Sequence, residues 1–123
     1  ETEKTKVEEQ KKNIMLISEN RELKNEVRRV LEGIGFDVIF ADDRVSAFKI
    51  LSENSDKISF VLIDSKTPRL HLREVIAELK IVKPDIRVVL LYSTPESVGL
   101  ENIEVIENPD ELIKIFSSIK PTS

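Results

Sequence analysis

The chain contains no cysteine, so disulfide bonds, thiolate metal sites and a cysteine nucleophile are all excluded. No apolar run approaches the roughly 20 residues that a membrane-spanning helix needs, and no secretory signal is visible. The single histidine, His71, has no second histidine with which to form a metal site. The Gly33-Ile34-Gly35 segment lacks the spacing of a dinucleotide-binding fingerprint. These absences favour a cytoplasmic, non-enzymatic protein that does not enter a membrane.

An excess of charge of one sign is also missing. The 23 acidic and 19 basic residues give a net charge of −4, and the basic residues are interleaved with acids. We therefore expect a mildly acidic surface with no general attraction for nucleic acid. A length of 123 residues, of which 40% are hydrophobic, is sufficient for one ordinary domain with one core.

Residues 1–12 differ from the rest of the chain in composition. Val7 is their only apolar residue, so this segment cannot bury a face. We therefore expect residues 1–12 to be a charged linker or tail and residues 13–120 to form the domain. A charged linker before the domain suggests that the domain follows another part of a larger parent protein.

Five short apolar runs alternate with segments of helical periodicity. The runs occupy residues 14–17, 36–41, 58–63, 88–91 and 103–106. Apolar residues at helical spacing occupy residues 23–34, 45–51, 72–82 and 112–119. The connection of residues 93–102 is short, so the fourth helix should be missing or reduced to about one turn. The alternation predicts right-handed crossovers and a parallel sheet covered by helices on both faces.

Several helix ends can be predicted from single residues. Gly33 and Gly35 should end the first helix, because glycine readily takes the left-handed conformation of a helix stop. Asp42 or Asp43 should cap the second helix, and Asn108, followed by proline and acids, should start the last one. The buried face of the last helix should consist of its apolar residues, namely Leu112, Ile113, Ile115, Phe116 and Ile119.

The central run, Ile58–Ile63, is apolar except for Ser59 and is followed at once by Asp64 and a turn. Such a run predicts a strand that is buried on both faces. Asp64 then stands at the carboxyl end of a central strand, where ligands and chemistry are found in open α/β sheets. Polar residues at the other strand ends should share this edge, namely Ser18, Glu19, Asn20, Tyr92, Ser93, Thr94, Glu107 and Asn108.

The order and spacing of these segments resemble the receiver domain of two-component response regulators. The matching segments are 14–17 with three polar residues after it, 31–38, 60–64 with a proline four residues later, 88–91, and Pro109 at the start of the last helix. The resemblance implies a doubly wound, flavodoxin-like (CheY-like) five-stranded parallel sheet of order 2-1-3-4-5. It also implies a role in phosphorelay signal transduction.

The resemblance implies a role for each residue at the site. In this family, an aspartate on the third strand accepts a phosphoryl group, and two acids after the first strand hold Mg²⁺. Asp64 keeps the acceptor position and Glu19 matches the second acid, whereas Ser18 replaces the first. The loss of one carboxylate weakens a site for a hard cation. We therefore expect no required cofactor, and at most weak Mg²⁺ binding by Glu19 and Asp64.

Three further positions depart from the family pattern. Asn108 replaces the lysine that pairs with the phosphoryl group, and an Asn cannot supply its positive charge. Tyr92 occupies the Ser/Thr position, although Ser93 could serve if the strand ended one residue later, and Val105 occupies the position of the aromatic switch. Lys66 is either a solvated loop lysine or an internal counter-ion, so we expect Lys66 or water to compensate the charge of Asp64.

Three functions remain open on these grounds. The first is an atypical receiver, or pseudo-receiver, that acts as a protein-interaction module with weak or lost phosphorylation. The second is a receiver that a histidine kinase phosphorylates on Asp64. The third is a flavodoxin-like module that binds a small molecule. For the first two, the partner is a histidine kinase or an output domain, either in the same parent chain or in a separate protein. The domain is then a monomer or a weak dimer that pairs through its first and last helices.

Overall fold

The computed structural model describes residues 13–97, 99–100 and 103–117, so the predicted tail of residues 1–12 lies outside the described residues. The strands are β1 (Asn13–Ile17), β2 (Asp37–Ala41), β3 (Ile58–Asp64), β4 (Arg87–Leu91) and β5 (Glu104–Ile106). The helices are α2 (Arg21–Glu32), α3 (Arg44–Glu53), α4 (Leu72–Val82), the 3-10 helix η1 (Pro95–Ser97) and α5 (Glu111–Phe116).

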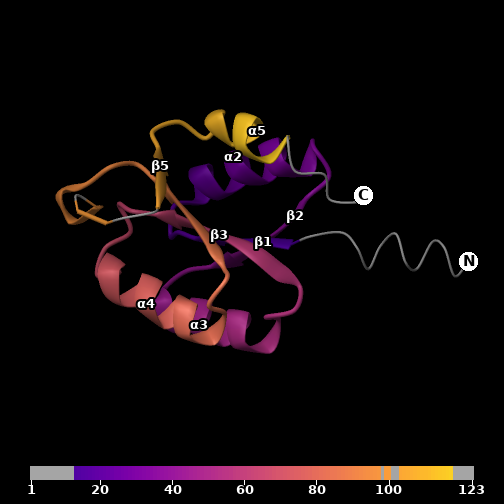
Figure 1. The fold of residues 1–123 in the computed structure, drawn as a ribbon. Coiled ribbons are helices and arrows are strands. Elements are labelled where there is room, and N and C mark those ends of the chain that lie inside the picture. Colours follow the sequence, from indigo (N-terminus) through magenta and orange to yellow (C-terminus); the bar gives the residue numbers. More distant parts are fainter. Residues whose placement is uncertain (1–12, 98, 101–102, 118–123) are drawn as a thin grey trace, which may run out of the picture.

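The five strands form one parallel sheet of order β2-β1-β3-β4-β5, which confirms the predicted topology. The central strand β3 is hydrogen-bonded to β1 on one side and to β4 on the other. Figure 1 shows α2 and α5 on one face of the sheet and α3 and α4 on the other. Because all the strands are parallel, their carboxyl ends meet at one edge, and Asp64 ends β3 at that edge.

The core consists of two layers, one on each face of the sheet. Successive residues of a strand point to opposite faces, so Met15 and Val61 pack toward α3 and α4, whereas Leu16 and Phe60 pack toward α2 and α5. This double burial explains why β1, β3 and β4 are continuous apolar runs and not alternating ones. On the second face, the fully buried ring of Phe116 contacts Phe60 edge-on, with 4.8 Å between the ring centroids.

The start of α3 agrees with the prediction, whereas α5 begins three residues after Asn108, at Glu111, with Asp110 in the N-cap position. Of the two candidates for capping α3, it is Asp43 whose side chain accepts a hydrogen bond of 2.8 Å from the Ser46 backbone N–H. At the start of α5, Asn108 Oδ1 accepts from the Asp110 N–H at 2.9 Å. Glu111 Oε2 accepts in return from the Asn108 N–H at 3.1 Å, so the two side chains stabilise the turn that precedes α5, while the N-cap Asp110 makes no side-chain cap.

Two predictions about helix ends and faces were wrong in part. Gly33 is right-handed, with a φ of −64°, because the last turn of α2 continues through it, and only Gly35 is left-handed, with a φ of 98°. Ile113 is 44% exposed, because α5 packs on the sheet through Leu112 and Phe116, which are four residues apart and share one face. The predicted contribution of Ile119 lies outside the described residues.

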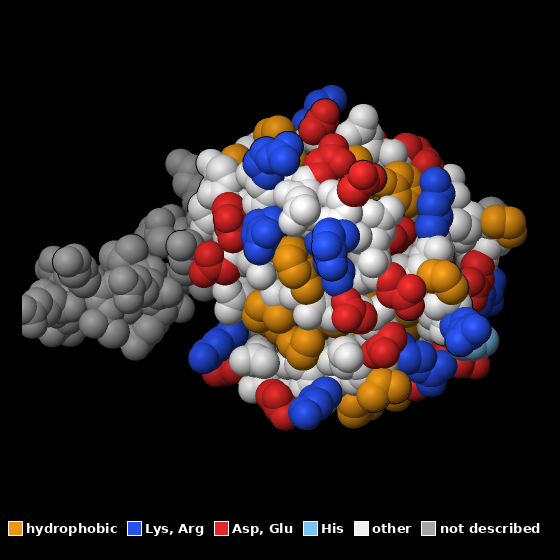
Figure 2. Space-filling model, turned by 180° about the vertical axis from the view of Figure 1, so that it is seen from behind, with side chains coloured by type: hydrophobic (Ala, Val, Ile, Leu, Met, Phe, Trp, Pro, Cys, Tyr) orange, Lys and Arg blue, Asp and Glu red, His pale blue; other side chains and the backbone are white. Residues whose placement is uncertain are grey.

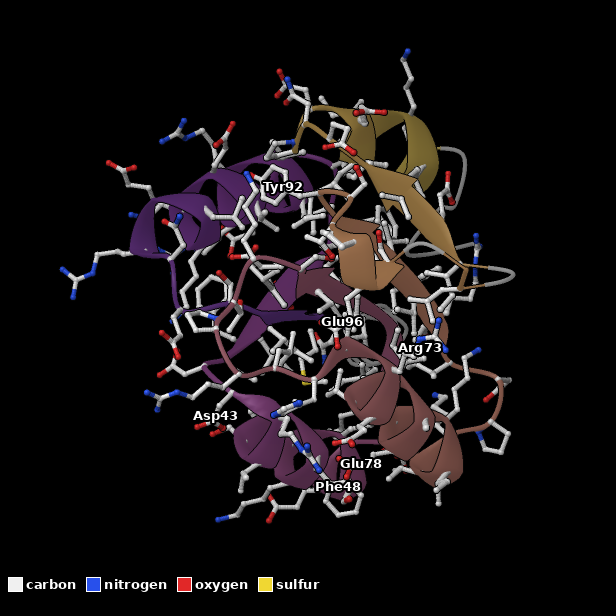
Figure 3. All side chains as sticks on the ribbon, turned by 90° about the vertical axis from the view of Figure 1, so that its left-hand side faces the viewer. Asp43, Phe48, Arg73, Glu78, Tyr92 and Glu96 are labelled. Carbon is white, nitrogen blue, oxygen red and sulfur yellow. The ribbon has the colours of Figure 1, made fainter. Side chains whose placement is uncertain are left out.

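The fourth helix is reduced to the three-residue 3-10 helix η1, as its short connection predicted. Glu96 of η1 has a structural role, since its Oε2 accepts a hydrogen bond of 2.9 Å from the Leu72 N–H at the start of α4. The residue before Leu72 is His71, which is left-handed and makes no side-chain cap of its own. Glu96 therefore caps α4 from a different loop, and Figure 3 shows how Glu96 and Arg73 of α4 lie on this side of the molecule.

The surface carries both signs of charge. Figure 2 shows acidic and basic side chains interspersed over the back of the molecule, with small groups of hydrophobic side chains between them. On this face, basic and acidic side chains alternate (Figure 2). None of the helices within the described ranges is long and apolar enough to cross a membrane.

Candidate functional site

The site is centred on Asp64, which is only 4% exposed. Ser18 Oγ donates a hydrogen bond of 2.8 Å to Asp64 Oδ2, and the Lys66 backbone N–H donates one of 3.0 Å to Oδ1. Ser18 is fully buried, and its Oγ also accepts from the Asn20 N–H at 3.0 Å. Each oxygen of the buried carboxylate therefore has a donor from the protein itself, as buried polar groups require.

Strand register places Ser18 and Asp64 together. Ile17 of β1 is paired with Ile63 of β3, so the next residue on each strand reaches the same point of the carboxyl edge. The Lys66 N–H is brought in by the turn that follows β3, in which Thr67 N–H also bonds back to the Asp64 carbonyl at 3.0 Å. The sequence predicted that these residues share the edge.

Lys66 approaches the site in an unexpected way. Its ammonium lies over the ring of Tyr92, with Nζ 4.3 Å from the ring centroid. Such a cation–π contact is worth about 0.5–1 kcal/mol at an exposed site. In the described part of the chain, Lys66 makes no ion pair with Asp64 or Glu19. Lys66 thus bonds to Asp64 through its backbone, whereas its charge lies on the ring of Tyr92.

Tyr92 is held in a conformation that is uncommon for a bulky residue, with a φ of 79°. Its backbone N–H donates to the Ile106 carbonyl at 2.6 Å, which fixes it to the end of β5. Burial raises the pKa of the Tyr92 phenol above its ordinary value, and the negative charge of Asp64 raises this pKa further. Glu26 and Glu107 act on the pKa of Tyr92 in the same direction.

Tyr92 allows a direct optical test of this arrangement, because the chain has one tyrosine and no tryptophan. We expect the tyrosinate absorbance of the folded protein to rise at a pH above the ordinary tyrosine pKa of about 10. Asp64→Asn should bring the pKa of Tyr92 closer to that value, while Asp56→Asn, at an exposed position not among the causes of the shift, should leave it unchanged. Equal midpoints in the three proteins would contradict the electrostatic contact.

The same shift fixes the sign of a pH effect on stability. The folded protein holds the Tyr92 proton more tightly than the unfolded chain. The contribution of the protonated Tyr92 phenol to stability is therefore complete below the pKa that Tyr92 has in the unfolded chain. It is lost as the pH rises through the pKa that Tyr92 has in the folded protein.

Ser93 and Asn108 have other partners. Ser93 donates to Glu107 Oε2 from its hydroxyl at 2.6 Å and from its backbone N–H at 3.0 Å. The Ser93 hydroxyl is the main cause that lowers the pKa of Glu107, followed by the Ser93 N–H, and the charge of Lys66 also contributes. Asn108 forms hydrogen bonds in the turn before α5, as described above. Ser93, Asn108 and the exposed Glu19 make no hydrogen bond or ion pair with Asp64 within the described residues.

The donor set does not fit a tight Mg²⁺ site. A hard divalent cation needs several oxygen ligands, usually with more than one carboxylate or with phosphate oxygens. At Ser18 the side chain is a neutral hydroxyl that donates its proton to Asp64. No group of three or more acidic, histidine or cysteine side chains suited to a metal occurs in residues 13–97, 99–100 and 103–117. Weak binding by Glu19 and Asp64 stays a prediction.

Glu96 also contributes a hydrogen bond near the carboxyl edge of the sheet, one that was not predicted from the sequence. Its bond to Leu72 N–H joins the loop after β3 to the loop after β4, and both loops border Asp64. The two residues are 24 positions apart, so no local pattern in the sequence points to their contact.

Comparisons with known proteins agree with the fold. No protein-family model matches the chain, and no curated protein matches it. A response regulator from Thermotoga maritima is 26% identical over 88% of this chain and 96% of its own, with a TM-score of 0.69. The chemotaxis protein CheY4 of Vibrio cholerae is 14% identical over 89% of this chain and 98% of its own, with a TM-score of 0.73.

A third solved structure is informative about chemistry. It is a response regulator protein from Burkholderia pseudomallei with a phosphorylated aspartic acid, a calcium ion and citrate. It is 25% identical over 84% of this chain and 64% of its own, with a TM-score of 0.66. The chain therefore has the fold of response regulator receiver domains, as its sequence pattern predicted.

Proposed function

We propose that this domain works in two-component signal transduction as a protein-interaction module with a receiver fold, and that Asp64 is mainly a structural carboxylate. The observation that carries the proposal is the pair of hydrogen bonds that Ser18 Oγ and the Lys66 N–H donate to the two oxygens of Asp64. These bonds tie β1, β3 and the following turn together. The partner is a histidine kinase or an output domain, either in the same parent chain or in a separate protein.

The chemistry of phosphoryl transfer supports this proposal. A carboxylate oxygen of Asp64 would have to attack phosphorus while the bond to the leaving group breaks, and negative charge gathers on the phosphoryl oxygens. Cations must stabilise that charge, because there is little other chemistry for the protein to do. Here Ser18 occupies the place of an acid, Asn108 is a neutral residue in the turn before α5, and the Lys66 ammonium lies on Tyr92. Transfer to Asp64 should therefore be slow or absent.

The alternative is a working phosphoryl acceptor, and the position of Asp64 favours it. Asp64 ends the central strand, and a structure with the same fold contains a phosphorylated aspartic acid. The two candidates differ in one measurable product, an acyl phosphate on Asp64.

The test incubates the domain with acetyl phosphate and Mg²⁺ and follows the intact mass. We expect no stoichiometric adduct on the wild-type chain. The double variant Ser18→Asp with Asn108→Lys restores the second acid and the lysine, so it should gain an adduct that is lost again when Asp64→Asn is added. A stoichiometric adduct on wild-type Asp64 would overturn the proposal in favour of the alternative.

A further inference from the structure

The outer surface of α3 and α4 carries large apolar side chains that the fold does not use. Val45 on α3 is 74% exposed, Phe48 on α3 is 43% exposed, and Ile81 on α4 is 78% exposed. Val45 and Phe48 are three residues apart, so they share one side of α3, whereas the sheet is covered by Ala47 and Leu51. A helix that needs only one buried face gains nothing in folding from a second apolar side.

Two of these side chains, Val45 and Phe48, border a groove between the two helices. Arg44, Val45, Phe48 and Glu78 line a hollow with a volume of about 260 Å³. Figure 3 shows Phe48 of α3 and Glu78 of α4 close together on this surface. Small-molecule pockets usually measure about 300–1,000 Å³, so the hollow better suits one or two side chains of a protein partner.

Arg44 fixes the geometry of the groove. Its Nη1 bonds to Glu74 Oε1 at 2.9 Å and its Nη2 bonds to Glu78 Oε2 at 2.7 Å, so it links α3 to α4. The hydrogen bond that Arg44 donates to Glu74 and the charge of Glu78 raise the pKa of Arg44, which remains charged. Because Arg44 already links α3 and α4, the side chains of the groove lose less conformational entropy when a ligand binds.

Carboxylates outnumber the cation that binds them beside the groove. Glu74 and Glu78 share the single guanidinium of Arg44, so these three side chains carry a net charge of −1. Ile81 is three residues beyond Glu78 on the same side of α4, so it extends the apolar surface beyond the acids.

We infer that the α3–α4 groove, defined by Val45, Phe48, Glu74, Glu78 and Ile81, docks an amphipathic helix with basic flanks from a partner protein. Apolar side chains of that helix, at spacings of three and four residues, enter the hollow beside Phe48 and cover Ile81. Lysine or arginine residues beside them meet Glu74 and Glu78. This inference rests on the proposed role as an interaction module, and it names the surface and the chemistry of the partner.

The test uses two designed helical peptides with the same leucine stripe. One carries lysines beside the stripe, and the other carries glutamates at the same positions. Each is titrated into the ¹⁵N-labelled chain, and amide shifts are followed by NMR. We expect the lysine peptide to shift the amides of Val45, Phe48, Glu78 and Ile81, and to bind at least tenfold more tightly than the glutamate peptide.

Matched variants identify the surface. Phe48→Asp should weaken binding of the lysine peptide about tenfold or more, as is usual for an apolar anchor. Ile113→Asp should leave the affinity unchanged, because Ile113 is 44% exposed, much like Phe48 at 43%, but lies on α5 across the sheet. Glu74→Lys should reduce the ratio of the affinities for the lysine and glutamate peptides, because it changes a charge beside the groove and removes no apolar contact.

Three results would overturn the inference. They are shifts centred on residues outside the groove, equal affinity for the two peptides, and concentration-dependent shifts of the same residues in the free chain, which would show that a second copy occupies the groove. Asp64 takes no part in this assay. An acyl phosphate on Asp64 would therefore refute the proposed loss of phosphorylation and leave the groove unaffected, and failure of peptide binding would refute only the groove.

Discussion

Phe116→Ala should lower the free energy of unfolding by about 3–5 kcal/mol, the usual cost of removing a buried phenyl ring. Phe116 is fully buried, and its ring packs edge-on against Phe60 and Phe36, with centroids 4.8 and 5.5 Å away. The described part of α5 has six residues, so this contact provides much of what holds the helix on the sheet. Because domains of this size are stable by about 5–15 kcal/mol, the loss is a large fraction of the total.

Urea unfolding followed by circular dichroism measures this loss. The matched control is Ile113→Ala on the same helix, where the side chain is 44% exposed and the change should stay within about 0.5 kcal/mol. Similar losses in the two variants would mean that α5 is not held by its inner face. In that case the packing described for this side of the sheet would be wrong.

Ser18→Asp should destabilise the protein by about 3–5 kcal/mol when no divalent cation is present, which is the cost of an uncompensated buried charge. Ser18 is fully buried and its Oγ is 2.8 Å from Asp64 Oδ2, so the change replaces a hydrogen bond with two carboxylates in contact. Two such groups raise the pKa of one of them. Stability should therefore recover as the pH falls and the shared site takes up a proton.

The same variant should respond to Mg²⁺, because the second carboxylate supplies the ligand that Ser18 does not. Millimolar Mg²⁺ should restore part of the lost stability, since a ligand that binds only the folded state stabilises it. Ser18→Asn is the control, because asparagine has about the same size as aspartate but carries no charge. Two results would contradict the interpretation that Ser18 stands where a metal-binding acid would stand. They are an increase in the stability of Ser18→Asn on adding Mg²⁺, and no change in the stability of Ser18→Asp.

The fold followed from the sequence because its signals are local and agree with one another. The runs of 14–17, 58–63 and 88–91 are apolar at every position or nearly so, and such runs form buried parallel strands. The strand order required the resemblance to receiver domains in addition. The meeting of Ser18 with Asp64 followed from that order, because it only requires β1 and β3 to be neighbours.

Side-chain directions could not be predicted in the same way. Lys66 is two residues from Asp64, which suggests an ion pair, but its flexible side chain turns its charge onto the ring of Tyr92. The position of Tyr92 depends on its left-handed backbone, which nothing in the neighbouring residues indicates. On α3, Val45 and Phe48 read as core residues by type, and only the packing against the sheet shows that they face outward.

The cap that Glu96 provides for α4 has a consequence for local opening of the native state. Many helices carry their cap next to their own first turn, so the cap and the helix form together. In this chain the partner of the Leu72 N–H lies 24 residues later, so this N–H is bonded only while η1 is docked on α4. The hydrogen exchange of the Leu72 amide therefore reports how often η1 moves away from α4 in the native state.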